Sequence, residues 1–551
     1  MAGCMQNEMK GRVGGMGSLL LKAEEAEAIK REAAGLKGVD LRGDALALLE
    51  LLLLGFCAPL RGYLGRADCE AVLADGRLKD GRPLARPVLL EAGAALAESL
   101  APGERVALRD PEGVLLGVLT VEEAWRAADL GEDAVRELAA FGHDGGVFLA
   151  GPVAGVEAPV HYDFAALRLS PEELRGQFAK RGWRRVLACQ PAGMIHRAEA
   201  ARIVHAARIA QANVLVLAPV TEEQTITLDH FTRVRALEHG LHYLPERGAL
   251  LSLLPIPGAP GGRGVLWRAL LARNAGATHL LVEPEWWGEA DEAARRSATG
   301  LASELGIELV DLPRFARDDA LHAFLPVHAE AGASAHDMTA EIVRRVRAGE
   351  EVPAWLSFPE VVEELRRSHP VRGRQGVTVF FTGLSGAGKS TIARVLLSKL
   401  LEIGDRTVTL LDGDIVRKHL SSELGFSRAH RDLNIQRIGF VASEITKHGG
   451  IALCAPIAPY RETRRKVRAM VEAHGGFVEV HVATPLETCE GRDRKGLYAK
   501  ARAGIIKEFT GISDPYETPE RAELVIDTRE CTPLEAAQMI VTRLETEGFI
   551  R

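Results

Sequence analysis

Cysteine is sparse in this chain of 551 residues, and it lacks the spacings that hold metals or build disulfide frameworks. The seven cysteines are scattered, and no two of them form a Cys-x-x-Cys pair. Zinc knuckles and small disulfide-stabilised domains depend on such clusters, so both classes are excluded. The scattered thiols indicate a reducing compartment, and we expect a cytoplasmic protein.

Long hydrophobic runs and a strong excess of one charge are also lacking. The longest apolar run covers residues 45–56, contains Glu50 and is shorter than the ~20 residues that a membrane-spanning helix requires. Residues 1–17 have no apolar core of signal-peptide length and are expected to form a flexible lead. The net charge of −7 is small for this length, and nothing indicates a nucleic-acid surface. We therefore expect neither a membrane nor a nucleic acid as a partner.

The length exceeds what a single core organises, and the pattern along the chain predicts several domains. Residues 18–165 mix short apolar stretches with Gly and Pro breaks, which is typical of a β-rich domain with some helices. Residues 166–328 alternate expected strands with helices, which indicates an α/β domain with a parallel sheet. Residues 329–372 are expected to form a short helical connector, and residues 373–551 the last domain. In the second domain, strands are expected over residues 185–189, 213–218 and 279–282, and a helix over 197–212.

A glycine-rich loop opens the last domain. Gly383-Leu-Ser-Gly-Ala-Gly-Lys-Ser-Thr391 follows the apolar run 377–382 and precedes a helical pattern over 392–401. Between a strand and a helix, such a loop rings a phosphate with backbone N–H groups, while Lys389 reaches the terminal phosphates and the Ser390 hydroxyl holds Mg²⁺. The sequence therefore predicts a nucleoside triphosphate site. Its residues are Gly383, Ser385, Gly386, Ala387, Gly388, Lys389, Ser390 and Thr391.

Two aspartates follow the next expected strand. Asp412 and Asp414 flank a glycine after the apolar run 408–411, and in a parallel sheet that end faces the ligand crevice. A carboxylate there orients Mg²⁺ or accepts the proton of an attacking hydroxyl, although the same pair also fits a polar turn. We expect Asp414 to be the catalytic base and Asp412 to assist Mg²⁺. Spacing alone does not separate the two roles.

The segment 424–439 carries Phe426, Arg431 and Asn434. An aromatic face, a guanidinium and an amide suit a nucleotide that bears an anionic group. Taken alone, these residues fit better a core phenylalanine and a solvated helix face. The order of motifs along the domain decides between the two readings.

Those motifs resemble the adenosine 5′-phosphosulfate (APS) kinase family over essentially all of residues 376–551. The resemblance implies transfer of the ATP γ-phosphate to the 3′-hydroxyl of APS, giving 3′-phosphoadenosine 5′-phosphosulfate (PAPS), with ATP and Mg²⁺ as cofactors. The matching stretches are Gly-Leu-Ser-Gly-Ala-Gly-Lys-Ser-Thr, Leu-Asp-Gly-Asp-x-Val-Arg, Leu-Gly-Phe-Ser, Arg-x-x-Asn-Ile, Cys-Glu-x-Arg-Asp-x-Lys-Gly-Leu-Tyr, Lys-Ala-Arg-Ala-Gly and Phe-Thr-Gly-Ile.

By position, the resemblance implies a substrate site for APS. Phe426 and Phe509 would sandwich the adenine. The ribose and phosphosulfate would be gripped by side chains from three further positions, and two more residues would lie in the same zone. These are Arg417, Arg431 and Asn434, and then Ile457 and Lys495.

The basic segment 492–502 would form a lid over both nucleotides, with Arg492 on the ATP side. Exclusion of water by a lid strengthens each charge contact and discourages ATP hydrolysis. The chain departs from many relatives at Ala458, which replaces a serine that can be phosphorylated. Because alanine has no hydroxyl, direct in-line transfer is the remaining route.

The front part of the chain resembles ATP sulfurylase, the enzyme family that makes APS from ATP and sulfate. The resemblance covers residues from about 18 to 370. It implies a β-rich PUA-like N-terminal domain, an α/β nucleotidyltransferase-like domain and a helical connector. The matching segments are residues 56–63, 77–83, 173–183, 274–279 and 353–362.

The active-site motifs of that family are eroded. Gln190 to Glu199 stands where the family has Gln-Thr-Arg-Asn-Pro-x-His-Arg-Ala-His. Gln190, His196 and Arg197 survive, whereas Ala192, Gly193 and Glu199 replace the arginine, the asparagine and the second histidine. Residues 283–288 replace Gly-Arg-Asp-His-Ala-Gly with Glu-Pro-Glu-Trp-Trp-Gly, and of the Met-Arg-x-Ala-Gly-Pro-Arg stretch only Arg263 remains.

Sulfate binding and transition-state stabilisation require positive charge and hydrogen-bond donors. We therefore expect little sulfurylase activity and a scaffold role for this region, in a homo-oligomer that is a dimer or a hexamer. A regulatory nucleotide or anion pocket is the alternative for the domain. For the whole chain, the alternatives are a bifunctional enzyme with two working sites and a nucleotide-binding regulatory protein without catalysis.

Overall fold

The computed structural model describes two compact units within residues 17–550. One comprises residues up to 344 together with 352–365, and the other comprises 345–351 together with 366–551. The predicted lead over residues 1–17 lies almost wholly outside the described residues. Among the described residues, no helix has the length and apolar character to cross a membrane. The gaps are residues 144, 192, 221–227, 246–247, 260, 289–291, 328–334, 405, 426 and 494–495, and positions 261, 335–336 and 414 are described by their backbone alone.

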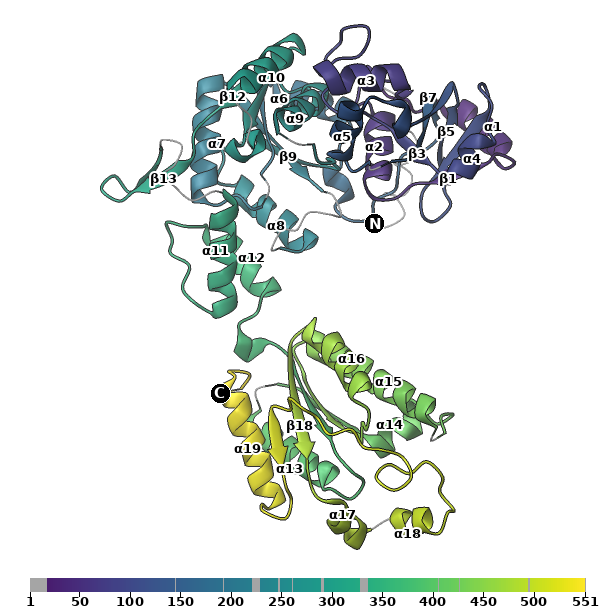
Figure 1. Ribbon diagram of the computed structural model, residues 1–551. Coiled ribbons are helices and arrows are strands. Elements are labelled where there is room, and N and C mark those ends of the chain that lie inside the picture. The colour runs from purple at the N-terminus through teal and green to yellow at the C-terminus, as the bar shows by residue number, and fades with distance from the viewer. Residues whose placement is uncertain are drawn as a thin grey trace. The chain divides into compact units, whose positions relative to one another are not determined.

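The first unit begins with a mainly antiparallel sheet of seven strands (Figure 1). The strand order is β1-β4-β5-β7-β2, and β3 and β6 also pair with the long strand β7. The elements are α1 (Ala23–Ala33), β1 (Gly38–Asp40), α2 (Gly43–Leu54), β2 (Gly62–Tyr63), α3 (Arg66–Asp75), β3 (Leu90–Ala92), α4 (Ala94–Glu98), β4 (Arg105–Arg109), β5 (Leu115–Thr120), β6 (Glu123–Arg126), α5 (Glu132–Ala139) and β7 (Val147–Gly155).

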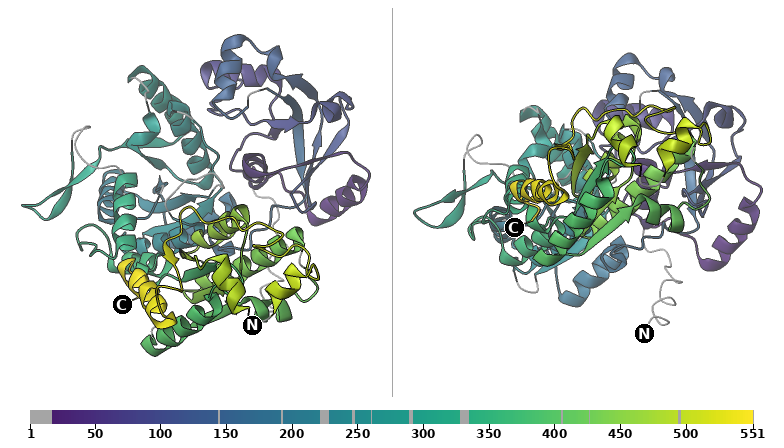
Figure 2. Two further views of the ribbon diagram at one scale, coloured as in Figure 1. Left: turned by 60° about the horizontal axis from the view of Figure 1, so that its bottom comes forward. Right: turned by 90° about the horizontal axis from the view of Figure 1, so that it is seen from below.

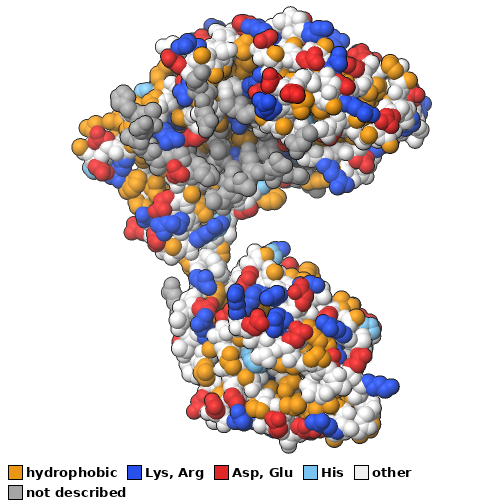
Figure 3. Space-filling view, in the orientation of Figure 1, with side chains coloured by type: hydrophobic (Ala, Val, Ile, Leu, Met, Phe, Trp, Pro, Cys, Tyr) orange, Lys and Arg blue, Asp and Glu red, His pale blue; other side chains and the backbone are white. Residues whose placement is uncertain are grey.

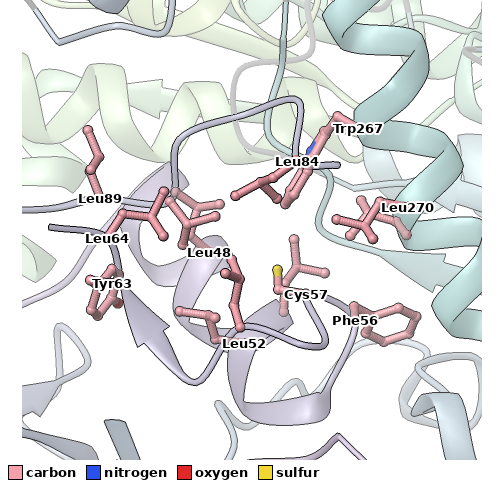
Figure 4. Packing of buried hydrophobic residues seen from close by; sticks show 14 of the residues in the cluster. Leu48, Leu52, Phe56, Cys57, Tyr63, Leu64, Leu84, Leu89, Trp267 and Leu270 are labelled. Atoms are coloured by element: carbon pink, nitrogen blue, oxygen red, sulfur yellow. The ribbon is translucent and has the colours of Figure 1, made fainter. Parts of the chain in front are cut away.

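The longest apolar run of the sequence forms α2, and this helix is buried on nearly all sides. Every residue from Ala47 to Leu53 is buried, as expected for a helix without a polar face. Leu48 and Leu52 pack in one core with Trp267 and Leu270, which come from the following domain (Figure 4). The two domains of the first unit therefore share a continuous hydrophobic core.

The second part of the first unit is an α/β domain with a five-stranded parallel sheet, in the order β10-β9-β8-β11-β12. The predicted strands at 185–189, 213–218 and 279–282 and the helix at 197–212 are confirmed, with boundaries that differ by a few residues. The elements are α6 (Pro171–Arg181), β8 (Val186–Cys189), α7 (Arg197–Ala210), β9 (Asn213–Pro219), α8 (His230–Leu241), β10 (Ala249–Leu254), α9 (Gly261–Ala275), β11 (His279–Val282), α10 (Glu292–Glu304) and β12 (Glu308–Asp311).

An antiparallel hairpin and two helices follow this sheet. They are β13 (Phe315–Asp318), β14 (Ala323–Pro326), α11 (Ala335–Ala348) and α12 (Pro359–Ser368). Phe358, just before α12, stacks on Tyr243 with ring centroids 3.6 Å apart, and Glu364 pairs with Arg235 at 2.5 Å. The first turns of α12 are thus joined to α8 and to the segment that follows it.

The second unit is a parallel α/β domain whose sheet has the order β16-β17-β15-β18-β19. Its elements are β15 (Val377–Thr382), α13 (Lys389–Ile403), β16 (Val408–Asp412), α14 (Gly413–His419), α15 (Arg428–Lys447), β17 (Ile451–Ala455), α16 (Arg461–Glu472), β18 (Gly476–Val482), α17 (Leu486–Arg492), α18 (Leu497–Arg502), β19 (Leu524–Ile526) and α19 (Pro533–Thr546).

Strand β15 is buried on both faces, which explains its continuous apolar sequence. Val379 and Phe381 pack with residues of α13 and α19, whereas Phe380 packs with residues of α15 and α16. Helices therefore cover both faces of the sheet, and Figure 2 shows the domain from two further sides. The fold class predicted from the sequence is confirmed.

The visible surface of both units carries acidic and basic side chains side by side (Figure 3). This mixture agrees with the small net charge. It gives that face no extended basic patch of the kind that binds nucleic acid.

Candidate functional site

The glycine-rich loop lies between β15 and α13, as the sequence predicts. Gly383 and Gly388 have φ of 146° and 112°, which L side chains rarely adopt. A Cβ atom on Gly383 would lie 2.5 Å from the carbonyl oxygen of Val482 on the neighbouring strand β18. Only glycine fits there without moving the backbone, so the loop closes tightly over the sheet edge.

Lys389 begins α13 and folds back over this loop. Its side chain is 7% exposed, and its Nζ donates to the carbonyl oxygens of Gly383 at 2.8 Å and Leu384 at 2.7 Å. The ammonium group is thus held inside the loop that would surround a phosphate. Ser390 follows in the first turn of α13, at the helix end where an anion is stabilised by the helix dipole.

Asp412 is the last residue of β16, at the carboxyl end of the parallel sheet. It is 5% exposed, and its Oδ2 lies 3.7 Å from Nη2 of Arg394 on α13. The carboxylate therefore lies next to the helix that starts at the glycine-rich loop, and its oxygens are of the kind that Mg²⁺ prefers as ligands. Asp414 lies two residues after Asp412, at the second position of α14. Its side chain lies outside the described atoms.

Several predicted substrate residues surround the same edge. Arg417 donates to the carbonyl oxygens of Leu424 and Gly425, just before the predicted stacking residue Phe426. Asn434 on α15 is 5% exposed, and its Oδ1 has no hydrogen-bond partner among the described residues. A buried acceptor without a partner is expensive, and a ligand donor would satisfy it. Phe426 and Lys495 lie outside the described residues.

Ile457 and Phe509 are brought in from distant parts of the sequence. The carbonyl oxygen of Ile457 accepts from the Gly383 N–H at 3.2 Å and from the Thr382 hydroxyl at 2.8 Å. Phe509 packs edge-on against Tyr498 with ring centroids 5.0 Å apart. The contacts place Ile457 directly beside the phosphate loop.

The predicted lid comprises the end of α17, residues 494–495, which lie outside the described residues, and α18. Arg492 donates to the Thr528 hydroxyl at 2.7 Å, and Thr528 in turn donates to the carbonyl oxygen of Ala387 in the phosphate loop. Tyr498 on α18 donates to the carbonyl oxygen of Ser385 at 2.9 Å. Tyr498 therefore contacts directly the loop that would hold ATP, and Arg492 is linked to that loop through Thr528.

The sequence interpretation assigned no role to Tyr498, Tyr460, Thr510 or Asp514, although all four contact predicted site residues. Tyr498 and Thr510 lie in stretches whose resemblance is stated above, in Gly-Leu-Tyr and Phe-Thr-Gly-Ile, and Tyr460 lies two residues after Ala458. Their position in or near these motifs was the signal in the sequence that could have marked them as site residues. Asp514 had none, because an aspartate beside a proline also reads as an ordinary turn residue.

In the first unit, two of the three surviving sulfurylase residues, His196 and Arg197, have local structural partners. Gln190, which follows β8, is 1% exposed, and neither its Nε2 nor its Oε1 has a hydrogen-bond partner among the described residues. His196 caps α7, because its Nδ1 accepts from the Glu199 N–H at 3.2 Å. The guanidinium of Arg197 lies over the ring of Phe358, 4.8 Å from its centre.

Glu199 and Glu283, which differ from the residues of the family motifs, lie beside the buried Arg202. Glu283 follows β11 and forms a close ion pair with Arg202 of α7, and Glu199 lies 3.6 Å from the same guanidinium. Burial, together with the nearby charge of Glu199, raises the pKa of Glu283 to about 8. A hollow lies beside them. Its lining residues are His196, Ala198, Glu199, Arg202, Glu283, Pro284, Glu285, Arg314, Phe315 and Met338.

Gly193 stands in the place of the asparagine of the motif, and Thr339 of helix α11 packs closely against it. A Cβ atom at position 193 would lie 2.8 Å from Oγ1 and 3.0 Å from Cγ2 of Thr339, which is 2% exposed. The room for a larger side chain is already filled. The neighbouring Ala192, in the place of the arginine, lies outside the described residues.

Restoring the asparagine should therefore destabilise the protein. Gly193→Asn forces Thr339 or its helix to shift, and overpacking of this kind costs about 1–3 kcal/mol. Thermal unfolding followed by calorimetry should show a lowered Tm for the transition of the first unit. Gly258→Asn is the control, because Gly258 is exposed and no heavy atom lies within 4 Å of a Cβ placed there. An equal loss in both variants would contradict the packing argument.

Comparison with known proteins finds three family matches along the chain. Residues 375–527 match the family described as adenylylsulphate kinase, residues 165–368 match ATP-sulfurylase, and residues 9–138 match a PUA-like domain.

Relatives of full length are found as well. The chain is 40% identical to a sulfate adenylyltransferase of Emericella nidulans and 39% identical to one of Phaeosphaeria nodorum, over 96% of both chains in each case. It is 42% identical to a solved hexameric APS kinase from Thiobacillus denitrificans, with 97% of each chain covered and a TM-score of 0.75. The chain belongs to the family in which an ATP sulfurylase region, preceded by a PUA-like domain, is joined to a C-terminal APS kinase domain.

Proposed function

We propose that the chain transfers the γ-phosphate of ATP to the 3′-hydroxyl of APS, giving PAPS and ADP. The observation that best supports this is the convergence at one sheet edge of the phosphate loop with Lys389, the carboxylate of Asp412, and the unpartnered Asn434 on α15. A phosphate cradle, a carboxylate and a buried acceptor are the groups that binding of two nucleotides in line requires.

The roles follow from position. Backbone N–H groups of residues 383–391 and Lys389 bind the phosphates of ATP. Ser390 and Asp412 supply oxygen ligands for Mg²⁺, which neutralises charge on the β- and γ-phosphates when bound. Asp414 accepts the proton of the 3′-hydroxyl, and Ala458 has no hydroxyl that could carry the phosphoryl group. The γ-phosphate therefore passes directly from ATP to APS.

The APS side uses residues from three segments. Arg417 and Arg431 bind the anionic groups, and Asn434 hydrogen-bonds the sugar. Phe509 stacks on the adenine, with Phe426 on its other face. Segment 492–502 closes over both nucleotides and excludes water.

We further propose that the sulfurylase region makes no APS at a useful rate. Arg202 of α7 is paired with Glu283 and Glu199, so this guanidinium is matched with carboxylates of the same domain. An anion such as sulfate would meet two carboxyl groups there, beside a guanidinium that they already occupy. Removing one donor of an anion-stabilising site costs about 10²- to 10³-fold in rate, and several are missing here.

A scaffold role fits the residues that the region retains. Asn274 lies in a segment that resembles the family, and its Nδ2 donates to the carbonyl oxygens of Phe56 at 2.6 Å and Ala58 at 2.9 Å in another such segment. Arg263, the remaining arginine of its motif, donates to Val72 on α3 at 2.6 Å. The preserved residues thus join the two domains of the first unit, whereas the lost ones served an anion site. With a hexameric relative, we expect a homo-oligomer that is a hexamer, or otherwise a dimer.

The function is tested by supplying purified protein with ATP, Mg²⁺ and APS and separating the nucleotides by chromatography. We expect PAPS and ADP in equal amounts. Binding of both nucleotides without turnover would favour the regulatory alternative instead.

A second reaction with the same preparation contains ATP, Mg²⁺, sulfate and pyrophosphatase, without APS. We expect no APS and no PAPS above a protein-free control. Sustained release of phosphate from pyrophosphate would establish the bifunctional alternative and remove the scaffold proposal.

A further inference from the structure

Arg431 is held by a turn nearly eighty residues further along the chain. It lies in the first turn of α15, and its Nη1 donates to the Thr510 hydroxyl at 2.7 Å and to Oδ2 of Asp514 at 2.8 Å. Its Nη2 donates to the carbonyl oxygen of Glu508 at 2.9 Å. Three acceptors on one turn therefore determine the direction of the guanidinium.

Asp514 also binds a second element. The Tyr460 hydroxyl donates to the same Oδ2 at 2.8 Å, and Tyr460 is 2% exposed in the loop between β17 and α16. Burial and this hydrogen bond raise the pKa of Tyr460 to about 12. The phenol therefore remains a donor at neutral pH, and the carboxylate links Arg431 to the loop that contains Ile457.

The turn that carries Asp514 also carries Phe509. The N–H of Asp514 donates to the Phe509 carbonyl oxygen at 3.1 Å, and the Phe509 N–H donates to the Ser513 hydroxyl at 2.9 Å. Gly511 closes the turn with an N–H bond of 2.7 Å to the Asp514 carbonyl oxygen. The aromatic side chain and the carboxylate therefore move as one body.

We propose that Asp514 is a positioning residue for APS, acting through Arg431 and through the turn of Phe509. The proposal rests on the APS kinase function proposed above. A guanidinium that is already oriented loses less side-chain freedom when an anion binds. With the carboxylate in place, the group that binds the phosphosulfate and the ring that stacks on the adenine keep a constant separation, as precise recognition of a nucleotide requires.

The test is Asp514→Asn, which preserves shape but removes the charge. Hydrogen bonds to charged groups contribute enough that their loss corresponds to roughly 10- to 100-fold in an equilibrium constant. We expect the KM for APS to rise by about this factor, with the KM for ATP unchanged and kcat reduced by less than the KM rises. A purely structural role would alter both KM values or neither.

Glu523→Gln is the matched control. Glu523 forms a two-contact ion pair with Arg468 at 2.8 and 2.9 Å in the same domain, and it accepts from the Glu479 N–H at 2.7 Å. Its loss removes a comparable half-buried ion pair away from the predicted substrate residues. We expect a lowered Tm and an unchanged KM for APS. An equal rise in KM for APS would mean general loosening of the domain and would overturn the proposal.

A double-mutant cycle tests whether Asp514 acts through Arg431. Calorimetric titration of APS in the presence of ADP and Mg²⁺ measures binding without turnover. If the proposal holds, Asp514→Asn weakens binding in the native background and adds nothing in an Arg431→Ala background. Additive effects in the two backgrounds would contradict it.

Tyr460→Phe decides the matter if Asp514→Asn does not fold. It removes one of the bonds to the carboxylate and should raise the KM for APS by about 2- to 5-fold. An unchanged KM would overturn the proposal.

Failure of the proposed function and failure of the positioning role give different results. A native protein that makes no PAPS refutes the proposed function, whereas an active native protein whose KM for APS does not respond to Asp514→Asn refutes only the positioning role.

Discussion

Replacement of Lys389 by alanine should abolish PAPS formation. The Nζ atom lies inside the phosphate loop, where it donates to the carbonyl oxygens of Gly383 and Leu384. We expect this ammonium group to contact the transferred phosphate and to stabilise its negative charge. Loss of one such charge reduces turnover by about 10²- to 10³-fold or more. The measurement is PAPS formation at saturating APS across a range of ATP concentrations.

Lys399→Ala provides the control for that substitution. Lys399 lies on the same helix α13, near its opposite end, and donates to Gln538 on α19 at 3.0 Å. Its removal should leave turnover near the native value. If Lys389→Ala kept native turnover, the loop would not be the phosphate site of the reaction.

Asp414→Asn should also stop transfer while leaving ATP bound. Asp414 follows the carboxyl end of β16 by two residues, and an amide accepts no proton at neutral pH. General base catalysis contributes about 10²- to 10⁴-fold, so the loss of turnover should lie in that range. Single-turnover PAPS formation gives the chemical step, and equilibrium titration with ATP gives binding.

Asp412→Asn separates the two carboxylates. If Asp412 serves Mg²⁺, this variant needs a higher Mg²⁺ concentration for half-maximal rate and recovers part of its turnover when Mg²⁺ is raised. Asp414→Asn should show no such recovery. The reverse outcome, with recovery only in Asp414→Asn, would exchange the two assignments.

The first unit departs further from the motifs of the family that it resembles than the second unit does. In the first unit, Asn274 still holds the carbonyl oxygens of Phe56 and Ala58, while Glu283 pairs with Arg202. A fold requires the same buried neighbours whether or not it binds a substrate, so packing contacts are expected to persist where motif residues differ.

Much of the kinase site could be predicted from the chain alone. The apolar run 377–382, the glycines at 383, 386 and 388, and the aspartates after 408–411 are local patterns, and backbone geometry turns each of them into strand, loop and strand end. Because parallel strands end at one edge, these separate patterns also predict a common site. The structure has the predicted strands and helix in place.

Other parts of the site depend on contacts between segments that no local pattern connects. Asp514 bonds to Arg431 and Tyr460 from 83 and 54 positions away in sequence. Thr339 fills the space above Gly193, and Glu283 meets Arg202, again across long separations. An isolated aspartate, threonine or glutamate carries no periodic signal, so its partner is defined only when the chain is folded.

The sequence by itself determined the phosphate loop, the fold class and the likeness to both enzyme families, because these rest on short-range spacing and on hydrophobic alternation. Only the tertiary structure decided which residue orients Arg431 and which side chain fills the space above Gly193. Those outcomes depend on which side chains become neighbours in a close-packed interior, where a difference of one methyl group or one charge selects the partner.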